Sequence, residues 1–353
     1  MTVIEEYEAA ASAGKWLEAL QLAQQIAERA PHPTCWFNVG VCLDELNRHM
    51  EAAQAFQRVI AGDYFDDGAR FRMLRSLFLT GDSGVQIVHD EIATIVRALP
   101  QVVVELSQLE TFTSLFKQDE FAVLKTAAER NLETRRTSLQ HLSGEGFVFS
   151  EPIPLRQSDH AIALRSMTEI GRRVLALQCV FLYVSSEGES VDTREISNCL
   201  ESNDVGYHLA IDEQEIFSRS RSQAQAEFGG ASGWYLERML PLAWILGFEG
   251  LPRPDGKALS GSNWDALFPF VGKPSTCKLA SWLTTFKARD EACVIEMEDA
   301  HYCAHIAMQR ARSGEDTVPD GFDPVFNGGV ILERWHSLLW ALSPTMDWEE
   351  ASF

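Results

Sequence analysis

Residues 34–59 read TCWFNVGVCLDELNRHMEAAQAFQRV, and this stretch decides the fold of the first part of the chain. On both sides of Asn47, apolar and small residues recur about three or four positions apart, which is the spacing of one helix face. Asn tolerates a positive φ at low cost, so Asn47 suits a tight turn between two helices. Ala52 lets two helices approach closely, and Phe56 fills the gap beside it. We therefore predict a helix, a turn and a second helix.

The same pattern extends outward from this stretch. Gly14, Asn47 and Gly81 are spaced by 33 and 34 residues, and small or apolar residues recur at fixed distances from each of them. Two units fit throughout, whereas the third fits only in its first half. Over about residues 3–100 the chain resembles the tetratricopeptide repeat. The residues that carry this motif are Trp36, Gly40, Leu43, Ala52 and Phe56.

The resemblance implies a right-handed superhelix whose concave side is lined by the first helix of each unit. The positions that would line this repeat groove are Ile4, Glu8, Phe37, Val41, Asp44, Phe71, Arg75 and Phe78. The groove is expected to be partly apolar and partly acidic, and to bind a protein. The Lys/Asn pattern that clamps a C-terminal carboxylate is missing, which disfavours chaperone-tail binding. In the alternative interpretation, the units only pack against the second domain.

A stretch with several glycines and prolines divides the chain into two domains. The helical pattern continues to residue 142, and the stretch 143–158 then interrupts it with two glycines and two prolines. We expect a repeat domain with capping helices over 1–142, a linker over 143–158 and a second domain over 159–353.

The second domain also follows helical periodicity, and strand-like alternation is scarce throughout the chain. Asp192 and Asp212 each precede a Glu by three positions, as in a capping box. Helices are expected over 193–202, 213–228, 232–246, 275–289, 291–312 and 328–342. The predicted fold class is all-α: a short tetratricopeptide-like superhelix followed by a globular helical domain.

A second resemblance covers about residues 160–353. It is carried by Arg172, Leu175, Glu215, Trp234, Glu237, the run Trp244–Gly247, Glu333, Arg334, Leu338, Trp340 and Trp348. This region is similar to a bacterial family, the domain of unknown function numbered 4272. It departs at Cys303 and His305, where a tryptophan is expected. The family has no settled activity, so the resemblance implies a fold and a bacterial origin.

Several residues of this set suggest a pocket. Trp234, Glu237, Pro241 and Trp244 are placed along one helix face by spacings of three, four and seven. A buried carboxylate there needs a partner, which Arg334 or Arg172 can supply as a bidentate pair. Either the group surrounds a ligand cavity, or it is a buried ion pair that fixes helix register. The pocket candidates are Trp234, Glu237, Trp244, Glu333, Arg334 and Trp340.

Catalytic and metal motifs are weak. Glu298 and His301 form an E-x-x-H pair, and Glu333 and His336 form another. Di-iron bundles use two such pairs, but the abundance of Glu in this chain makes two pairs unremarkable. No nucleophile elbow, P-loop or dinucleotide fingerprint occurs. We therefore assign no catalytic residue, no metal and no cofactor.

The net charge and the cysteine content restrict the partners and the location that we expect. The formal net charge is −21, which disfavours nucleic acid and anionic membranes as partners and favours a basic protein. The seven cysteines are an odd number without a C-x-x-C pair, so free thiols are expected. The acidic start, MTVIEEYE, lacks the basic and apolar regions of a secretory signal, and no 18-residue apolar run occurs. A cytoplasmic location is expected.

Together these features favour a non-enzymatic protein-binding module. Its most concrete form is an acidic immunity protein that neutralises a bacterial toxin. The alternative is an enzyme or small-ligand sensor built around Glu237, Arg334 and the neighbouring tryptophans. In that alternative, a buried carboxylate acts as an acid, a base or a ligand contact.

Overall fold

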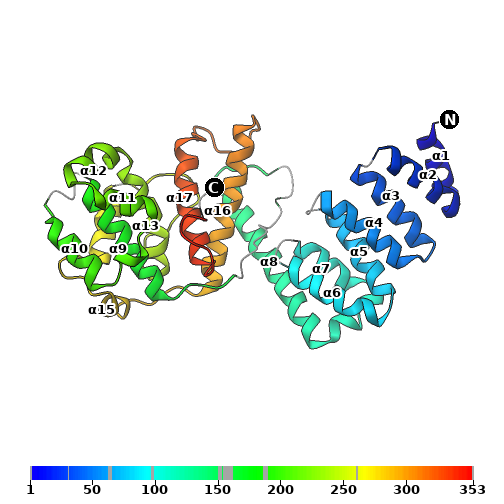
Figure 1. The fold of residues 1–353 in the computed structure, drawn as a ribbon, viewed down its shortest axis with the longest axis horizontal. Helices are drawn as coiled ribbons and strands as arrows, with labels where there is room; N and C mark the ends of the chain where they lie inside the picture. Colours follow the sequence, from blue (N-terminus) through cyan, green and yellow to red (C-terminus); the bar gives the residue numbers. More distant parts are fainter. Residues whose placement is uncertain are drawn as a thin grey trace. The chain divides into compact units, whose positions relative to one another are not determined.

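The computed structural model describes residues 2–30, 32–62, 66–96, 99–149, 153, 162–185, 190–259 and 261–351, and the side chains of 82–83 and 261–264 are outside this description. Every element in these ranges is helical, which confirms the all-α prediction (Figure 1). The chain folds into two compact units, which meet in sequence between Glu133 and Thr134. We call them the N-terminal unit and the C-terminal unit.

The N-terminal unit is a series of helical hairpins. Its first six helices are α1 (Val3–Ser12), α2 (Trp16–Arg29), α3 (Pro33–Glu45), α4 (His49–Gly62), α5 (Asp67–Leu79) and α6 (Asp82–Ile95). They are followed by α7 (Pro100–Gln108), the 3-10 turns η1 (Glu110–Phe112) and η2 (Leu115–Lys117), and the start of α8 (Asp119–Gly144). Each helix from α1 to α6 packs on the next one in the chain. The second helices α2, α4 and α6 are each 14 residues long.

The turn residues expected from the sequence adopt the backbone conformation that the hairpins need. Gly14, Asn47 and Gly81 have φ values of 69°, 57° and 88°. Inside the second hairpin, Gly40 of α3 faces Phe56 of α4 so closely that a Cβ on Gly40 would lie 2.6 Å from the Phe56 ring. Phe56 itself is fully buried. Turn geometry and one glycine–phenylalanine contact thus fix the hairpin.

We expect Asn47→Ala to lower the free energy of unfolding of the N-terminal unit by about 1 kcal/mol, because alanine lacks the short polar side chain whose local hydrogen bonding lets Asn adopt the left-handed conformation. Asn47→Gly should leave it unchanged or raise it, since Gly adopts positive φ without strain. Urea denaturation followed by circular dichroism measures both changes. Equal destabilisation by the two substitutions would show that the Asn47 side chain, and not its φ, matters.

The C-terminal unit is built around one almost entirely buried helix. α9 (Met167–Val184) is buried from Val174 to Val184, so it is the apolar centre on which other helices pack. The shorter elements of the unit are α10 (Thr193–Ser202), η4 (Gly206–His208), α11 (Ile211–Ser218), α12 (Arg221–Phe228), η5 (Gly229–Ala231), α14 (Gly261–Val271) and α15 (Leu279–Leu283). The longer ones are α13 (Ser232–Ile245), α16 (Glu291–Arg312) and α17 (Phe326–Ala341). α13 packs on both α9 and α17, and α17 also packs on α16 (Figure 1).

The helix predictions for this unit differ in accuracy. The bounds of α10 and α16 are as predicted, and those of α13 and α17 differ by one or two residues. The expected helix 213–228 is wrong, because Arg219 is extended and Ser220 caps a new helix through a capping box with Gln223. The helix expected over 275–289 is also wrong. Only Leu279–Leu283 is helical, and Lys278 before it is extended.

The C-terminal unit begins earlier than the domain boundary expected from the sequence. Arg135 of α8 is buried and pairs with Asp299 of α16 at 2.8 Å. Phe147, in the first half of the expected linker 143–158, is buried against Phe322 with ring centroids 5.7 Å apart. This half therefore packs into the C-terminal unit, whereas most of 150–161 lies outside the described residues.

Candidate functional site

The residues expected to line the repeat groove lie in different environments. Ile4 and Glu8 are exposed on α1, Asp44 is buried on α3, and Phe37, Val41, Phe71, Arg75 and Phe78 are half-buried on α3 and α5. Phe78 packs against Phe112 with ring centroids 4.3 Å apart, so it belongs to the packing beneath η1. Their role in binding stays a prediction.

Asp44 is the structural centre of this face. Its Oδ1 accepts a hydrogen bond from Ser76 Oγ at 3.0 Å and lies 2.8 Å from His49 Nδ1, while Oδ2 lies 3.3 Å from Arg75 Nη1. Three helices therefore share one carboxylate. This carboxylate therefore holds α3, α4 and α5 together and fixes the position of Arg75.

A pocket of about 240 Å³ opens on the N-terminal unit next to this network. It is lined by Asp67, Gly68, Phe71, Arg72 and Arg75 of α5, and by Glu105 of α7. Phe71 and Arg75 were predicted, whereas the other four were missed. Gly68 and Arg72 precede Phe71 and Arg75 by three positions each, a helical spacing that could have found them, but Glu105 comes from beyond the recognised repeats. Arg72 also lies over the ring of Phe37, 5.6 Å from its centroid.

The predicted pairing of Glu237 and Arg334 exists in the C-terminal unit. Arg334 Nη2 and Nε lie 2.7 and 2.8 Å from Glu237 Oε2, and both side chains are buried. Arg334 also donates to the carbonyl oxygens of Arg253 and Lys257 at 2.7 and 2.8 Å. Arg172, the other candidate partner, instead lies 3.6 Å from Asp204. The ion pair therefore ties α13, α17 and the 253–259 segment together.

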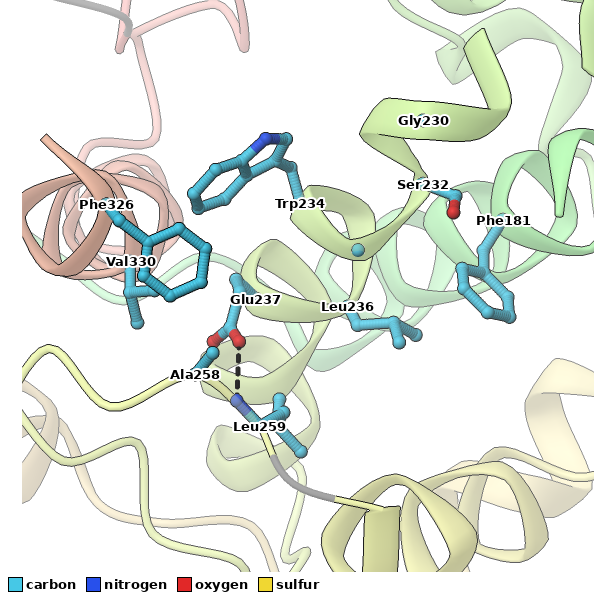
Figure 2. Close-up of a pocket in the computed structure, with 11 residues that line it drawn as sticks. Phe181, Gly230, Ser232, Trp234, Leu236, Glu237, Ala258, Leu259, Phe326 and Val330 are labelled. Carbon is cyan, nitrogen blue, oxygen red and sulfur yellow. Dashed lines mark hydrogen bonds between the residues drawn. The ribbon is translucent and has the colours of Figure 1, made fainter. Parts of the chain in front are cut away.

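A pocket of about 350 Å³ lies beside this ion pair (Figure 2). We call it the Trp234 pocket. Its lining residues are Phe181, Gly230, Ser232, Gly233, Trp234, Leu236, Glu237, Ala258, Leu259, Phe326 and Val330. Glu237 is the one carboxylate among them, and its Oε1 accepts a hydrogen bond from Leu259 N at 2.7 Å. The pocket is thus mainly apolar with a single acidic contact.

Consecutive glycines in α17 set the position of Trp234. A Cβ on Gly329 would lie 2.9 Å from Trp234 Cη2, and one on Gly328 would lie 2.8 Å from Met308 Cγ. Each glycine therefore admits a side chain of a neighbouring helix, α13 in one case and α16 in the other. Close packing of α17 against its two neighbours therefore accounts for both glycines.

The other pocket candidates are not part of this site. Glu333 accepts a hydrogen bond from Arg238 Nη2 at 3.3 Å, and thus forms a separate ion pair. Trp244 is buried beneath Arg289, and Trp340 packs against Trp348 with ring centroids 5.2 Å apart. The structure therefore brings Trp234, Glu237 and Arg334 together but not Glu333, Trp244 or Trp340. Phe326, Val330 and Leu259 were missed, because they reach the pocket only through tertiary packing.

The E-x-x-H residues make packing contacts. Glu298 Oε1 accepts a hydrogen bond from Trp335 Nε1 at 2.9 Å, and His301 Nδ1 donates to Met297 O at 2.9 Å. Within the described ranges, no three His, Cys, Asp or Glu side chains come together in an arrangement that could hold a metal ion. The seven cysteines are free thiols.

Burial lowers the pKa of His301 to about 3. Its Nδ1–H faces a carbonyl, so protonation would place a proton on Nε2, which is buried without a hydrogen-bond partner. The folded state thus binds no proton here between the unfolded pKa of about 6.5 and the folded pKa, whereas the unfolded state does. Burial of His301 therefore lowers the free energy of unfolding as the pH falls through this range.

Between pH 7 and pH 5, we expect the free energy of unfolding to fall by about 2 kcal/mol less in His301→Leu than in the wild type. Each pKa unit corresponds to about 1.4 kcal/mol. Urea denaturation at both pH values measures the difference. The control is His208→Asn, because His208 is exposed in the same unit. If His301→Leu keeps the wild-type acid sensitivity, burial of this imidazole is not its cause.

The fold and its pockets define an all-helical protein in which a series of hairpins precedes a compact helical domain. The profile of the family described as "Domain of unknown function (DUF4272)" matches residues 134–351. The chain therefore belongs to this family. The match begins at the first residue of the C-terminal unit and includes Arg135 and its partner Asp299. No curated protein and no solved structure matches the chain.

Among the helices that the structure describes, none combines the length and the apolar character that a membrane crossing requires.

Proposed function

We propose that this protein is a non-enzymatic polypeptide-binding protein whose N-terminal hairpins form a tetratricopeptide-like recognition face. The observation that carries the proposal is the pocket on α5 and α7, where Phe71 and Arg75 lie beside Arg72 and Glu105. Two of these four residues were selected from the repeat pattern alone. The equal lengths of α2, α4 and α6 and the positive φ at each turn support the repeat assignment.

The chemistry of this pocket suits an extended segment with an apolar side chain next to polar groups. Phe71 offers an apolar ring, Arg72 and Arg75 offer donors, and Asp67 and Glu105 offer acceptors. Because both signs of charge are present, the pocket itself sets register and specificity. The net charge of −21 acts at longer range, where it attracts a basic partner and raises its association rate.

The concrete form of the proposal is an immunity protein that neutralises a basic bacterial toxin. An acidic recognition protein can cover the active surface of such a toxin without performing chemistry. On this proposal, a strain that lacks the protein becomes sensitive to the toxin, and expression of the full chain restores resistance. Nucleic acid and anionic membranes are not expected as partners, because the net charge repels them.

The experiment is affinity capture from host lysate with three forms of the full chain: wild type, Arg72→Glu and Arg130→Glu. Arg130 is exposed on α8 and outside the pocket, so it is a matched charge-reversal control. We expect wild type and Arg130→Glu to recover the same partner, and Arg72→Glu to bind the purified partner about tenfold more weakly. Recovery of no partner, or equal binding by all three forms, would contradict the proposal.

A further inference from the structure

We propose that the Trp234 pocket of the C-terminal unit binds a small, neutral, flat aromatic molecule that carries one hydrogen-bond donor. This inference concerns a different unit from the proposed polypeptide-binding face and does not depend on it. It is carried by the volume of the pocket, its aromatic residues, the hydrogen bonds of Glu237 and the open space beside two glycines.

The size and walls of the pocket suit a small ring system. Its volume of about 350 Å³ falls within the usual range of small-molecule sites, about 300–1,000 Å³. The walls come from α9, α13, α17 and residues 258–259, and Leu236 and Val330 are buried within them. Together with Gly230 of η5, these segments of one compact unit form a concave, mainly apolar surface.

Two aromatic side chains offer stacking surfaces. Trp234 and Phe326 line the pocket with ring centroids 6.0 Å apart and planes at 53° to each other (Figure 2). Phe326 is 53% exposed, which leaves much of this apolar ring in contact with water. A flat aromatic guest that packs against both rings would cover this surface and gain offset or edge-to-face contacts. This arrangement favours an aromatic ligand over a flexible aliphatic one.

The hydrogen bonds of Glu237 select a neutral donor. Oε2 accepts a hydrogen bond from Arg334 Nε and lies 2.7 Å from Arg334 Nη2, and the guanidinium compensates the carboxylate charge. The Glu237 carboxylate therefore offers no uncompensated charge to attract a cation. Oε1 accepts a hydrogen bond from Leu259 N, drawn as the dashed line in Figure 2. A carboxylate oxygen accepts along two lone pairs, so Oε1 retains capacity for one donor of a ligand. An N–H or O–H group on the ring fits this position.

Gly230 and Gly233 keep the side of the pocket next to α13 open. A Cβ built on either residue would meet nothing within 4 Å. Gly233 precedes Glu237 by one helical turn, so a side chain there would extend into the space beside the carboxylate. Gly233 therefore stands at a position in the first turn of α13 where any side chain would reduce the space for a ligand.

The test uses indole as the probe and benzothiophene as a probe of the same shape without the N–H donor, measured by isothermal titration against the full chain. We expect saturable binding of indole at one site, and binding of benzothiophene about tenfold weaker, because a hydrogen bond to a charged acceptor is lost.

Two variants locate the site. Gly233→Phe fills the pocket and should abolish binding of both probes, and Phe326→Ala should weaken it by removing an exposed ring. Gly144→Phe is the matched control, because a Cβ there also meets nothing within 4 Å and Gly144 lies outside the pocket. Absence of saturable indole binding, or unchanged binding in both Gly233→Phe and Phe326→Ala, would overturn the proposal. Equal affinity for indole and benzothiophene would refute the role of Glu237 as acceptor.

Discussion

Replacing Arg334 by leucine is expected to lower the free energy of unfolding of the C-terminal unit by about 3–5 kcal/mol, the usual cost of removing one partner of a buried ion pair. The side chains of Arg334 and Glu237 are 3% and 5% exposed. Without Arg334, the Glu237 carboxylate loses its counter-ion and the donor to Oε2, and the carbonyl oxygens of Arg253 and Lys257 lose their Arg334 donors. Urea denaturation of the full chain, with circular dichroism and tryptophan fluorescence as probes, measures the change.

Two further variants separate charge burial from other causes. In Glu237→Leu/Arg334→Leu no charge stays buried without a partner, so we expect the double variant to be less destabilised than the sum of the two single variants. Arg219→Leu breaks the solvent-exposed pairs with Glu215 and Glu227, whose side chains are 59% and 48% exposed, and should destabilise the unit far less than Arg334→Leu. Additive effects in the double variant would contradict this explanation.

Phe56→Ala is expected to lower the free energy of unfolding of the N-terminal unit by about 3–5 kcal/mol, because it leaves a cavity in a packed core. Phe56 is fully buried, contacts Phe37 with ring centroids 5.5 Å apart, and fills the space that Gly40 leaves open. Hydrogen exchange of α3 and α4 under increasing urea measures this unit separately from the other.

The contact with Gly40 provides a sharper form of the same test. In the wild type, Gly40→Ala should cost about 1–3 kcal/mol, because its Cβ would lie 2.6 Å from the Phe56 ring. In the Phe56→Ala background that clash is gone, so the same substitution should cost little. An equal cost of Gly40→Ala in both backgrounds would show that the two residues do not form the close contact of this hairpin.

Local sequence signals predicted the N-terminal hairpins well because their determinants lie close together in the chain. Gly14, Asn47 and Gly81 act through their own backbone conformation, and Gly40 and Phe56 belong to a single hairpin. Such signals need no knowledge of distant segments. The helices at Thr193–Ser202 and Glu291–Arg312 were predictable for the same reason, since Asp192 and Asp290 cap their first turns.

The candidate sites were less predictable because they depend on tertiary packing. The helix period placed Trp234 and Trp244 on one face of α13, but over ten residues the face turns, and Trp244 packs beneath Arg289. The pairing of Glu237 with Arg334 followed from the need of a buried carboxylate for a partner. The approach of Leu259 and Phe326 to the same pocket left no local signal.

The most direct test of the polypeptide-binding account is photo-crosslinking to the captured partner. A p-benzoylphenylalanine is placed at position 72, in the pocket of α5, or at position 17, where Leu17 is exposed on α2 with 62% of its surface accessible. The account predicts that the chain crosslinks to its partner from position 72 and not from position 17. Crosslinking from position 17 alone, or from neither position while the partner is bound, would contradict a recognition face on α3, α5 and α7.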